Sequence, residues 1–435
     1  MALFTRRFLQ RALDGSTPYL SVKQRQDFCN LLNTVRDNYL STEWELAVLH
    51  ALNALGSLNY EPAFPGTSHP DVLFTADGSG LSFAADITSV SDRGLHQQNP
   101  YDALQEEFLR RQRKLGMLHG GFDVRVNSHT ENLFRGSGKK PRLKLPKRAD
   151  FPSKIFNADF QKFMVGVRDN PDEVRLLHIE DAETSVHFSY SPARRGFGGG
   201  SHPSFDLTTV IDKNPIYNAL SSKADQLRKS EYNGLKGILL CDAGCWSLHQ
   251  RSPNMQIYAR DEIVRHFLRQ NQSVSFVVAL IVEEEQATFA HTVKRFISPS
   301  VYLNNSAVHL QEQIERLAGS LVSRLPIPEQ SPRNAMSHLK RKDGMTGRHL
   351  ATLTKGTGIE MSARMLLEIL AGQLSVRDFE QNYRIEGALN PFRRMLEQGR
   401  LIEGITVEPH PEADDDRVTI RFGKPDSAIA PFRCD

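Results

Sequence analysis

The stretch from His69 to Asp92, HPDVLFTADGSGLSFAADITSVSD, constrains the fold more than any other part of the chain. Two apolar runs flank the sequence Asp77-Gly78-Ser79-Gly80, which is typical of a tight β-hairpin turn. If the two central residues of that turn form the loop, counting outward along both strands sets Asp71 directly opposite Asp86. The sequence therefore predicts two carboxylates on one face of a strand pair.

Two opposed carboxylates destabilise a strand pair unless a cation, a proton or a basic side chain lies between them. Carboxylate oxygens suit magnesium, and one or two of them suffice because the ion keeps several waters. A divalent metal is therefore the candidate occupant of the pair Asp71 and Asp86. In the alternative interpretation, Asp71 is a turn residue at the strand end and Asp86 is a salt-bridged edge residue. Asp86 interrupts the apolar run FAADITSV, which favours the metal site.

Length and composition limit the class of protein. A chain of 435 residues with 39% hydrophobic and 24% charged residues is typical of a soluble globular protein with two or three domains. No apolar run approaches the roughly 18 residues that a membrane helix needs. Arginines at positions 6, 7 and 11 interrupt the apolar N-terminal residues, so we expect no secretory signal. The formal charge of +3 neither indicates nor excludes a nucleic-acid partner.

The four cysteines do not form a CxxC pair, which argues against a disulfide framework and a zinc finger. A reducing, cytoplasmic location is expected. After residue 213 the helical and strand patterns alternate, which favours an α/β fold with a mixed central sheet flanked by helices. The predicted elements are a helix over 214–230, a strand over 237–244, a helix over 260–270 and a strand over 273–283.

We divide the chain into four parts from these patterns. They are an N-terminal helical arm (1–40), an α/β core (41–325) with a large insertion at about 95–205, a basic linker (326–358) and a small C-terminal α+β module (359–435). In the module, three short helices precede a strand pair, an order that resembles a winged-helix domain. The predicted ranges are 362–373, 376–383 and 390–399 for the helices, and 401–409 and 416–423 for the strands.

The residues Glu45, Pro70-Asp71 and Asp86-Ile87-Thr88 resemble the PD-(D/E)XK nuclease superfamily, whose core is a mixed sheet flanked by helices around a metal-binding acid cluster. The looser α/β resemblance extends to about residue 298. The resemblance implies that Asp71 and Asp86 bind Mg²⁺ or Mn²⁺, that Glu45 is an auxiliary ligand, and that a lysine two residues after the second acid activates water. Thr88 stands at that lysine position and departs from the pattern.

A lysine from elsewhere can replace the missing one, because some members of the superfamily supply it from the following core helix. In the predicted helix 214–230, Lys223 lies beside Gln226 at the edge of the apolar stripe, where it can reach the sheet. Alternatively, Lys223 covers the core with its stem and keeps its ammonium in water. Lys114, in an earlier predicted helix, is the competing donor.

The acid in the upstream helix has a structural alternative as well. Thr42 followed three residues later by Glu45 is also the pattern of a capping box, in which the glutamate satisfies a backbone amide at a helix start. The helical projection places Glu45 on the flank of the buried side and Glu43 pointing away.

A run of seven Lys or Arg residues without an acid extends over 135–148, RGSGKKPRLKLPKR. We expect a surface loop there that contacts phosphates and gives salt-dependent affinity. The alternative is a solvated charged segment. The candidate nucleic-acid contacts are Lys139, Lys140, Arg142, Lys144, Lys147 and Arg148. The segment 193–204, rich in glycine, is expected to be an irregular connection.

The leading hypothesis is a magnesium-dependent nuclease acting on DNA, with RNA as an alternative substrate and Lys223 as the positioned cation. The resemblance suggests restriction or anti-phage defence as the setting. One alternative is a catalytically degenerate nuclease fold that binds nucleic acid or a protein partner. Another is an unrelated phosphate-handling hydrolase. A homo-oligomer or a partner subunit in a multi-protein system stays open.

Overall fold

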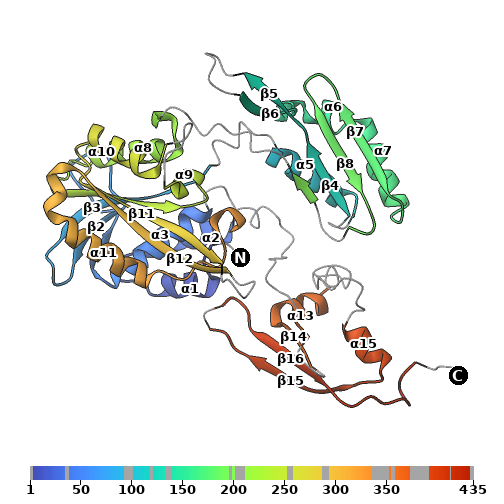
Figure 1. Cartoon of the computed structure of the whole chain (residues 1–435). Helices are drawn as coiled ribbons and strands as arrows, with labels where there is room; N and C mark the ends of the chain where they lie inside the picture. The colour runs from blue at the N-terminus through green and yellow to red at the C-terminus, as the bar shows by residue number, and fades with distance from the viewer. Residues whose placement is uncertain are drawn as a thin grey trace. The chain divides into compact units, whose positions relative to one another are not determined.

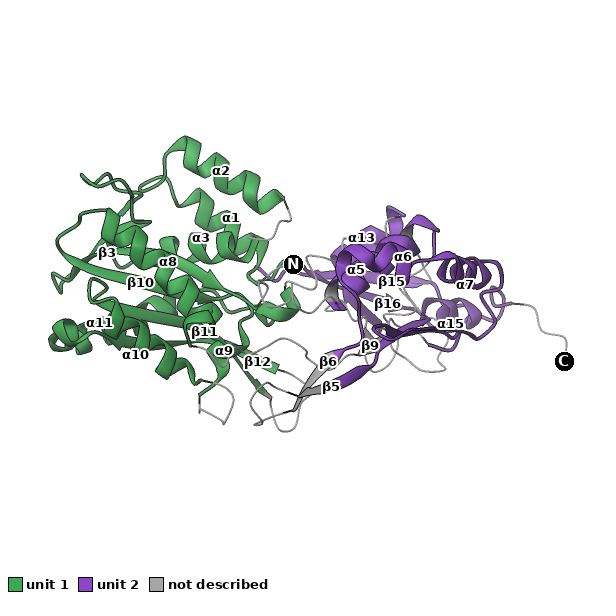
Figure 2. Ribbon diagram, turned by 90° about the horizontal axis from the view of Figure 1, so that it is seen from above, with its two compact units in different colours: residues 1–94, 206–344, 412–414 green, residues 95–205, 345–411, 415–435 purple. Residues whose placement is uncertain are grey.

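The computed structural model describes most of the chain, and its residues form two compact units (Figure 2). Unit 1 comprises residues 1–94, 206–344 and 412–414, and unit 2 comprises 95–205, 345–411 and 415–435. The first segment of unit 2, residues 95–205, has the same limits as the predicted insertion. The described residues are 3–34, 39–92, 101–117, 121–132, 139–194, 198–200, 211–251, 258–286, 293–335, 352–353, 358–372, 391–411 and 413–431.

Unit 1 is built on a six-stranded sheet with the strand order β1-β2-β3-β10-β11-β12. The central strands β3, β10 and β11 are parallel, and the remaining pairs are antiparallel. The sheet is therefore mixed, and the helices on its two faces make the unit α/β, as the sequence predicts. The strands are β1 (Gly56–Tyr60), β2 (Val72–Ala76), β3 (Ser82–Val90), β10 (Leu235–Asp242), β11 (Phe276–Gln286) and β12 (Val293–Leu303).

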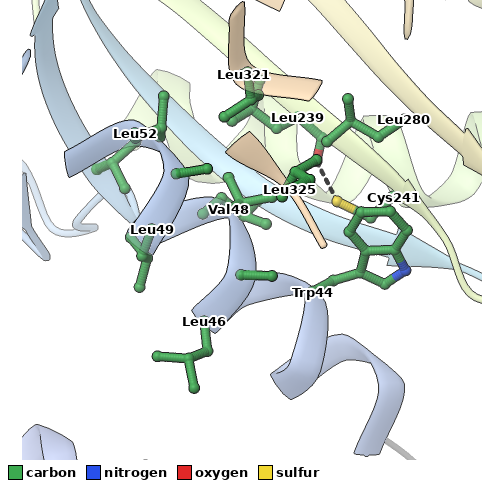
Figure 3. Close-up of a cluster of buried hydrophobic side chains, with 14 of the residues drawn as sticks. Trp44, Leu46, Val48, Leu49, Leu52, Leu239, Cys241, Leu280, Leu321 and Leu325 are labelled. Carbon is green, nitrogen blue, oxygen red and sulfur yellow. Dashed lines mark hydrogen bonds between the residues drawn. The ribbon is translucent and has the colours of Figure 1, made fainter. Parts of the chain in front are cut away.

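Each face of this sheet has its own hydrophobic core, because alternate side chains of a strand point to opposite faces. On one face, Ile87 and Leu239 pack with helices α1 (Arg6–Asp14), α2 (Val22–Asn33), α3 (Tyr39–Asn53) and α11 (Gln311–Arg324). Figure 3 shows Trp44 of α3 in this core beside Cys241 and Leu280. On the other face, Ile238 and Leu240 pack with α8 (Pro215–Lys229), α9 (Trp246–His249) and α10 (Arg260–Gln270). Figure 1 shows these three helices together on one side of the sheet.

The N-terminal segment belongs to the first of these cores and is held there by Glu43. Leu3 and Phe4 are fully buried, and their backbone N–H groups donate to Glu43 Oε2 over 2.9 and 3.2 Å. The prediction that Glu43 points away is therefore wrong, and burial raises the pKa of its carboxyl to about 8. The capping-box alternative is also wrong, because Thr42 lies inside α3 and does not precede it.

The hairpin of β2 and β3 has the predicted register. Val72 pairs with Ala85, so the next pair outward is Asp71 and Asp86. The predicted two-residue loop is wrong. The N–H of Ala76 donates to the carbonyl of Leu81 over 2.9 Å, and four residues connect them. Gly80 has a φ of +67°, a left-handed conformation that takes it out of the strand and into the turn.

The inserted part of unit 2 contains a four-stranded sheet with the order β7-β8-β4-β9 and a separate pair, β5-β6. Helices α5 (Tyr101–Lys114) and α7 (Ala158–Asp169) pack on one face of the larger sheet through phenylalanines such as Phe108, Phe160 and Phe188. The other elements are β4 (Phe122–Val126), β5 (Ser128–Asn132), β6 (Lys139–Leu143), α6 (Phe151–Lys154), β7 (Arg175–Glu180), β8 (Ser185–Tyr190) and β9 (Gly198–Gly200).

Two predicted loops of the insertion contain strands instead. Part of the basic run forms β6, which pairs antiparallel with β5. Part of the glycine-rich connection forms β9, parallel to β4. Neither sequence has the apolar alternation of a half-buried strand, so the pattern used to predict strands could not reveal them.

The C-terminal part of unit 2 contains a second four-stranded sheet, with the order β13-β14-β16-β15. The predicted strand pair is confirmed as β15 (Ile402–Glu408) and β16 (Arg417–Phe422), and the first and last predicted helices correspond to α13 (Ala363–Leu370) and α15 (Pro391–Glu397). Strands β13 (Thr352–Leu353) and β14 (Gly358–Ser362) were not expected. The predicted helix 376–383 lies outside the described residues, so the winged-helix resemblance stays a prediction. No described helix is long and apolar enough to cross a membrane.

Candidate active site

Asp71 and Asp86 meet at the open end of the β2–β3 hairpin and are fixed by the strands themselves. The N–H of Asp71 donates to Asp86 Oδ1 over 3.1 Å, and the N–H of Ile87 donates to Asp71 Oδ2 over 2.7 Å. Each carboxylate thus accepts a backbone hydrogen bond from the neighbouring strand. Asp86 lies within β3 and Asp71 directly precedes β2, so both positions are tied to the sheet, which favours a rigid site.

Helix α8 brings Lys223 to this pair. The helix begins at Pro215, where the Asn214 side chain accepts a hydrogen bond from the N–H of Ile216. Lys223 Nζ lies 3.2 Å from Asp71 Oδ2 and 3.7 Å from Asp86 Oδ1. The Lys223 side chain is 20% exposed, so its ammonium is directed at the two acids and does not extend freely into water.

Gln226 orients this ammonium, one helical turn after Lys223. Its Oε1 accepts a hydrogen bond from Lys223 Nζ over 3.0 Å, and its Nε2 donates to the carbonyl of His69 over 2.9 Å. The amide therefore joins α8 to the segment that leads into Asp71. The sequence indicates that Gln226 neighbours Lys223, but this bridging contact depends on the tertiary fold.

The electrostatics of the site are unbalanced, with one ammonium facing the fully buried carboxylate of Asp86 and the half-buried carboxylate of Asp71. Burial, followed by the charge of Asp71, raises the pKa of Asp86 to about 7, although Lys223 lowers it. Burial also raises the pKa of Asp71, and Lys223 opposes that rise. Asp86 is fully buried, and its Oδ2 accepts no hydrogen bond within the described part of the chain. A hard carboxylate oxygen in this condition fits a divalent cation.

Glu45 reaches the surroundings of the site from α3. Tyr60, the last residue of β1, donates a hydrogen bond to Glu45 Oε1 over 2.8 Å. Burial and then the charge of Asp71 raise the pKa of Glu45 to about 7. Among the described residues, no group of three or more His, Cys, Asp or Glu residues could hold a metal ion. Glu45 therefore lies close enough to Asp71 for their charges to interact, and its role as an auxiliary ligand stays a prediction.

Similarity to known proteins does not identify this site. No family model and no curated protein matches the chain. The interpretation therefore depends on the chemistry of Asp71, Asp86 and Lys223, which is that of two oxygen ligands held by a sheet and one cation supplied by a helix.

The remaining predicted residues have different surroundings. Thr88 is half-buried on β3, two residues beyond Asp86, and pairs with Leu240 of β10. Lys114 is exposed on α5, in unit 2.

The side chains of Lys139, Lys140 and Arg142 lie outside the described part, while their backbone forms part of β6. Lys144 is half-buried, and Lys147 and Arg148 are exposed. The structure thus leaves the predicted phosphate contacts of this run as a prediction.

Asp242 is a further buried acid that was not anticipated from the sequence. It ends β10, is fully buried, and accepts hydrogen bonds from the N–H of Gly244 over 2.8 Å and from His249 Nε2 over 2.9 Å. The hydrogen bond to Asp242 raises the pKa of His249. The signal was a single acid at the end of the apolar strand GILLCD. Because its bonds close the turn between β10 and α9, we assign Asp242 a structural role.

Proposed function

We propose that the protein is a metal-dependent nuclease of the PD-(D/E)XK type that hydrolyses phosphodiester bonds in DNA. The observation that carries this proposal is the buried Asp86 Oδ2, which has no hydrogen-bond partner among the described residues and lies next to Asp71 and Lys223. Structural ion pairs normally satisfy both oxygens of a buried carboxylate. An oxygen left open beside a second carboxylate is expected where a cation binds.

The fold supports the proposal at a coarser level. The mixed sheet flanked by helices is the architecture that the resemblance implies. The cation comes from α8, the helix that precedes β10, and β10 pairs parallel with the strand of Asp86. This is the position from which a replacement lysine was expected.

The residues present suit phosphodiester hydrolysis. Asp71 and Asp86 would hold Mg²⁺ or Mn²⁺, which neutralises charge on the scissile phosphate and supplies a water of lowered pKa. Lys223, within 4 Å of both carboxylates, can hold a phosphate oxygen or orient the attacking water. Glu45, with a pKa raised to about 7, is suited to exchange a proton near neutral pH.

The direct test incubates the purified chain with duplex and single-stranded DNA in the presence of Mg²⁺ or Mn²⁺, with EDTA as the metal-free control. We expect cleavage that needs the divalent ion. Direct detection of Mn²⁺ between Asp71 and Asp86, by anomalous scattering, would locate the ion. An absence of cleavage together with an absence of bound metal would contradict the proposal.

One observation favours a second function, a degenerate nuclease fold that only binds. Lys223 already pairs with Asp71, and Thr88 stands where the resemblance implies a lysine. A binder of this kind would retain salt-sensitive affinity for DNA but would neither cleave it nor gain stability from Mg²⁺.

The role of Lys223 can be tested by moving its charge. Lys223→Met is expected to lower the cleavage rate by about a hundredfold or more, because removal of one preorganised electrostatic group has that effect in other enzymes. Adding Thr88→Lys returns an ammonium to the same face of β3, and we expect at least about a tenfold recovery of the rate. The measurement is the initial rate of DNA cleavage at saturating Mg²⁺.

Lys229→Met is the matched control for Lys223→Met, because Lys229 is exposed at the end of the same helix. Its cleavage rate should equal that of the parent. If Lys223→Met also cleaves at the parental rate, Lys223 is a structural partner of the acids and has no part in the reaction.

A further inference from the structure

The insertion has a sheet face that its helices do not cover. Along β4, Phe122, Val124 and Val126 point into the core formed with α5 and α7. The alternating residue Arg125 therefore points to the opposite face and is exposed there. By the register of β4, β8 and β7, His187 and His178 lie on the same face as Arg125.

One row of paired residues crosses the whole sheet, and its side chains come from β7, β8 and β4. His178 of β7 pairs with His187 of β8, His187 pairs with Arg125 of β4, and Arg125 pairs with Gly200 of β9. The two imidazole rings are stacked, with centroids 4.3 Å apart and planes within 8° of parallel. Rings that stack between neighbouring strands must be perpendicular to the sheet, so they form a short stack that runs parallel to the sheet surface.

The stack of the two rings is exposed on its outer side, at His178. Strand β7 is the last strand in the sheet order, so no strand among the described residues covers the outer ring face of His178. His178 is exposed, and Leu176, on the same face two residues before it, is 67% exposed. A planar apolar group could continue the stack at this edge and rest against Leu176.

Positive charge lies near the stacked rings of His178 and His187. Asp123, the acid in the neighbouring row, is neutralised by Arg125 at 3.1 Å and by Arg194 at 3.3 Å. The exposed Glu180 is the acid at the far end of β7. Residues 95–205 contain 18 Lys or Arg against 13 Asp or Glu, a net charge of +5 that exceeds the +3 of the whole chain.

Lys144, in the basic run, is hydrogen-bonded through its backbone to the sheet that carries the stacked rings. The N–H of Lys144 donates to the carbonyl of Asn127, just after β4, and the N–H of Ser185, at the start of β8, donates to the carbonyl of Lys144; both distances are 2.8 Å. The exposed Lys147 and Arg148 follow directly. Exposed basic side chains therefore follow the end of the sheet that carries the stacked rings.

We propose that this face binds single-stranded nucleic acid, with a base stacked on the pair His178 and His187 and phosphates held by Arg125, Lys147 and Arg148. Bases of a single strand expose their ring faces, whereas those of a duplex are already stacked on each other. A metal site is a poorer interpretation, because the nitrogen lone pairs of parallel stacked rings do not converge on one point. The binding site is separate from the proposed cleavage chemistry and does not depend on it.

The test measures binding of the full chain to a fluorescent oligothymidylate, and to its oligouridylate equivalent, by anisotropy in EDTA, where metal-dependent cleavage cannot occur. We expect the double variant His178→Ala, His187→Ala to bind at least about tenfold more weakly, because stacking contributes roughly 1–3 kcal/mol per base. The double variant His178→Phe, His187→Phe keeps two rings and should bind within about twofold of the parent.

The control variant is His309→Ala, an exposed histidine of unit 1, which should bind like the parent. A duplex of the same length should compete poorly. The proposal is overturned if the parent does not bind, if it binds duplex as tightly as single strands, or if the alanine pair binds like the parent. A loss of binding in the phenylalanine pair equal to that in the alanine pair would overturn stacking as the cause. Cleavage in Mg²⁺, measured separately, reports only on the proposed active site.

Discussion

Asp86→Asn is expected to reduce metal-dependent DNA cleavage by about a thousandfold or more, the upper range for loss of a preorganised electrostatic group. Asparagine keeps the size of the side chain and an oxygen that can accept the hydrogen bond from the N–H of Asp71. It removes the negative charge that a divalent ion requires. The measurement is the initial rate of cleavage with Mg²⁺ or Mn²⁺ varied from zero to saturation.

The matched control is Asp77→Asn, the same chemical change in the same hairpin. Asp77 is exposed in the turn, and its backbone N–H donates to the carbonyl of Leu55. Its rate should equal that of the parent. Equal cleavage by Asp86→Asn and Asp77→Asn would show that the chemistry takes place elsewhere in the molecule.

The metal-free protein is expected to lose stability as the pH rises from about 4 to 8. The pKa of Asp86 rises from 3.8 in an exposed side chain to about 7 in the fold, and that of Glu45 from 4.5 to about 7. In this interval the folded chain binds more protons than the unfolded chain, so the free energy of unfolding falls with pH. The contribution is complete below the unfolded pKa and is lost as the pH passes the folded value. Each pKa unit corresponds to about 1.4 kcal/mol.

Magnesium should reverse this loss, because the ion replaces the protons between the carboxylates. The measurement is urea unfolding at pH 5.5 and pH 8, with EDTA and with Mg²⁺. The stabilisation by Mg²⁺ should be larger at pH 8 and should be absent in Asp86→Asn.

Other groups change the slope of stability with pH, so the difference between parent and variant is the informative quantity. The pKa of Glu43 is also raised, to about 8, and that of His249 is raised by Asp242, so both lower the stability in the same direction as the pH increases. Glu43→Gln should remove part of the slope in EDTA and leave the effect of Mg²⁺ intact. A parent whose stability stays constant or rises between pH 5.5 and 8 in EDTA would contradict the raised pKa values of these acids.

Local patterns predict the elements near the site well. The hairpin register follows from alternation along two apolar runs and a glycine-containing turn, and the α8 stripe follows from its spacing of three and four residues. By contrast, β12 was not predicted, because Pro299 and two serines interrupt its apolar signal. Pro299 is tolerated there because β12 is an edge strand. Strand β1 was also missed, since its five residues are all partly exposed.

The candidate site shows where sequence reasoning ends. The opposition of Asp71 and Asp86 is a local count along a hairpin, so it could be predicted. Lys223 is 152 residues from Asp71 in the sequence, and its approach depends on how α8 packs on the sheet. The sequence could therefore only offer Lys223 as one of two candidate donors, the other being Lys114. The burial of Glu43 was predicted incorrectly because the helical projection considers one helix alone, whereas the partners of Glu43 are backbone amides of Leu3 and Phe4.

The hydrogen bonds from the N–H groups of Leu3 and Phe4 to Glu43 determine how this chain can be shortened in domain-dissection experiments. A version that starts after Phe4 would leave a buried carboxylate in α3 without the two N–H groups that it accepts hydrogen bonds from. Two residues further along α3 lies Glu45, next to the acid pair. Loss of activity in such a shortened chain could therefore arise from distortion of α3, and it should not be attributed to a missing DNA contact unless Glu43→Gln in the full chain behaves differently.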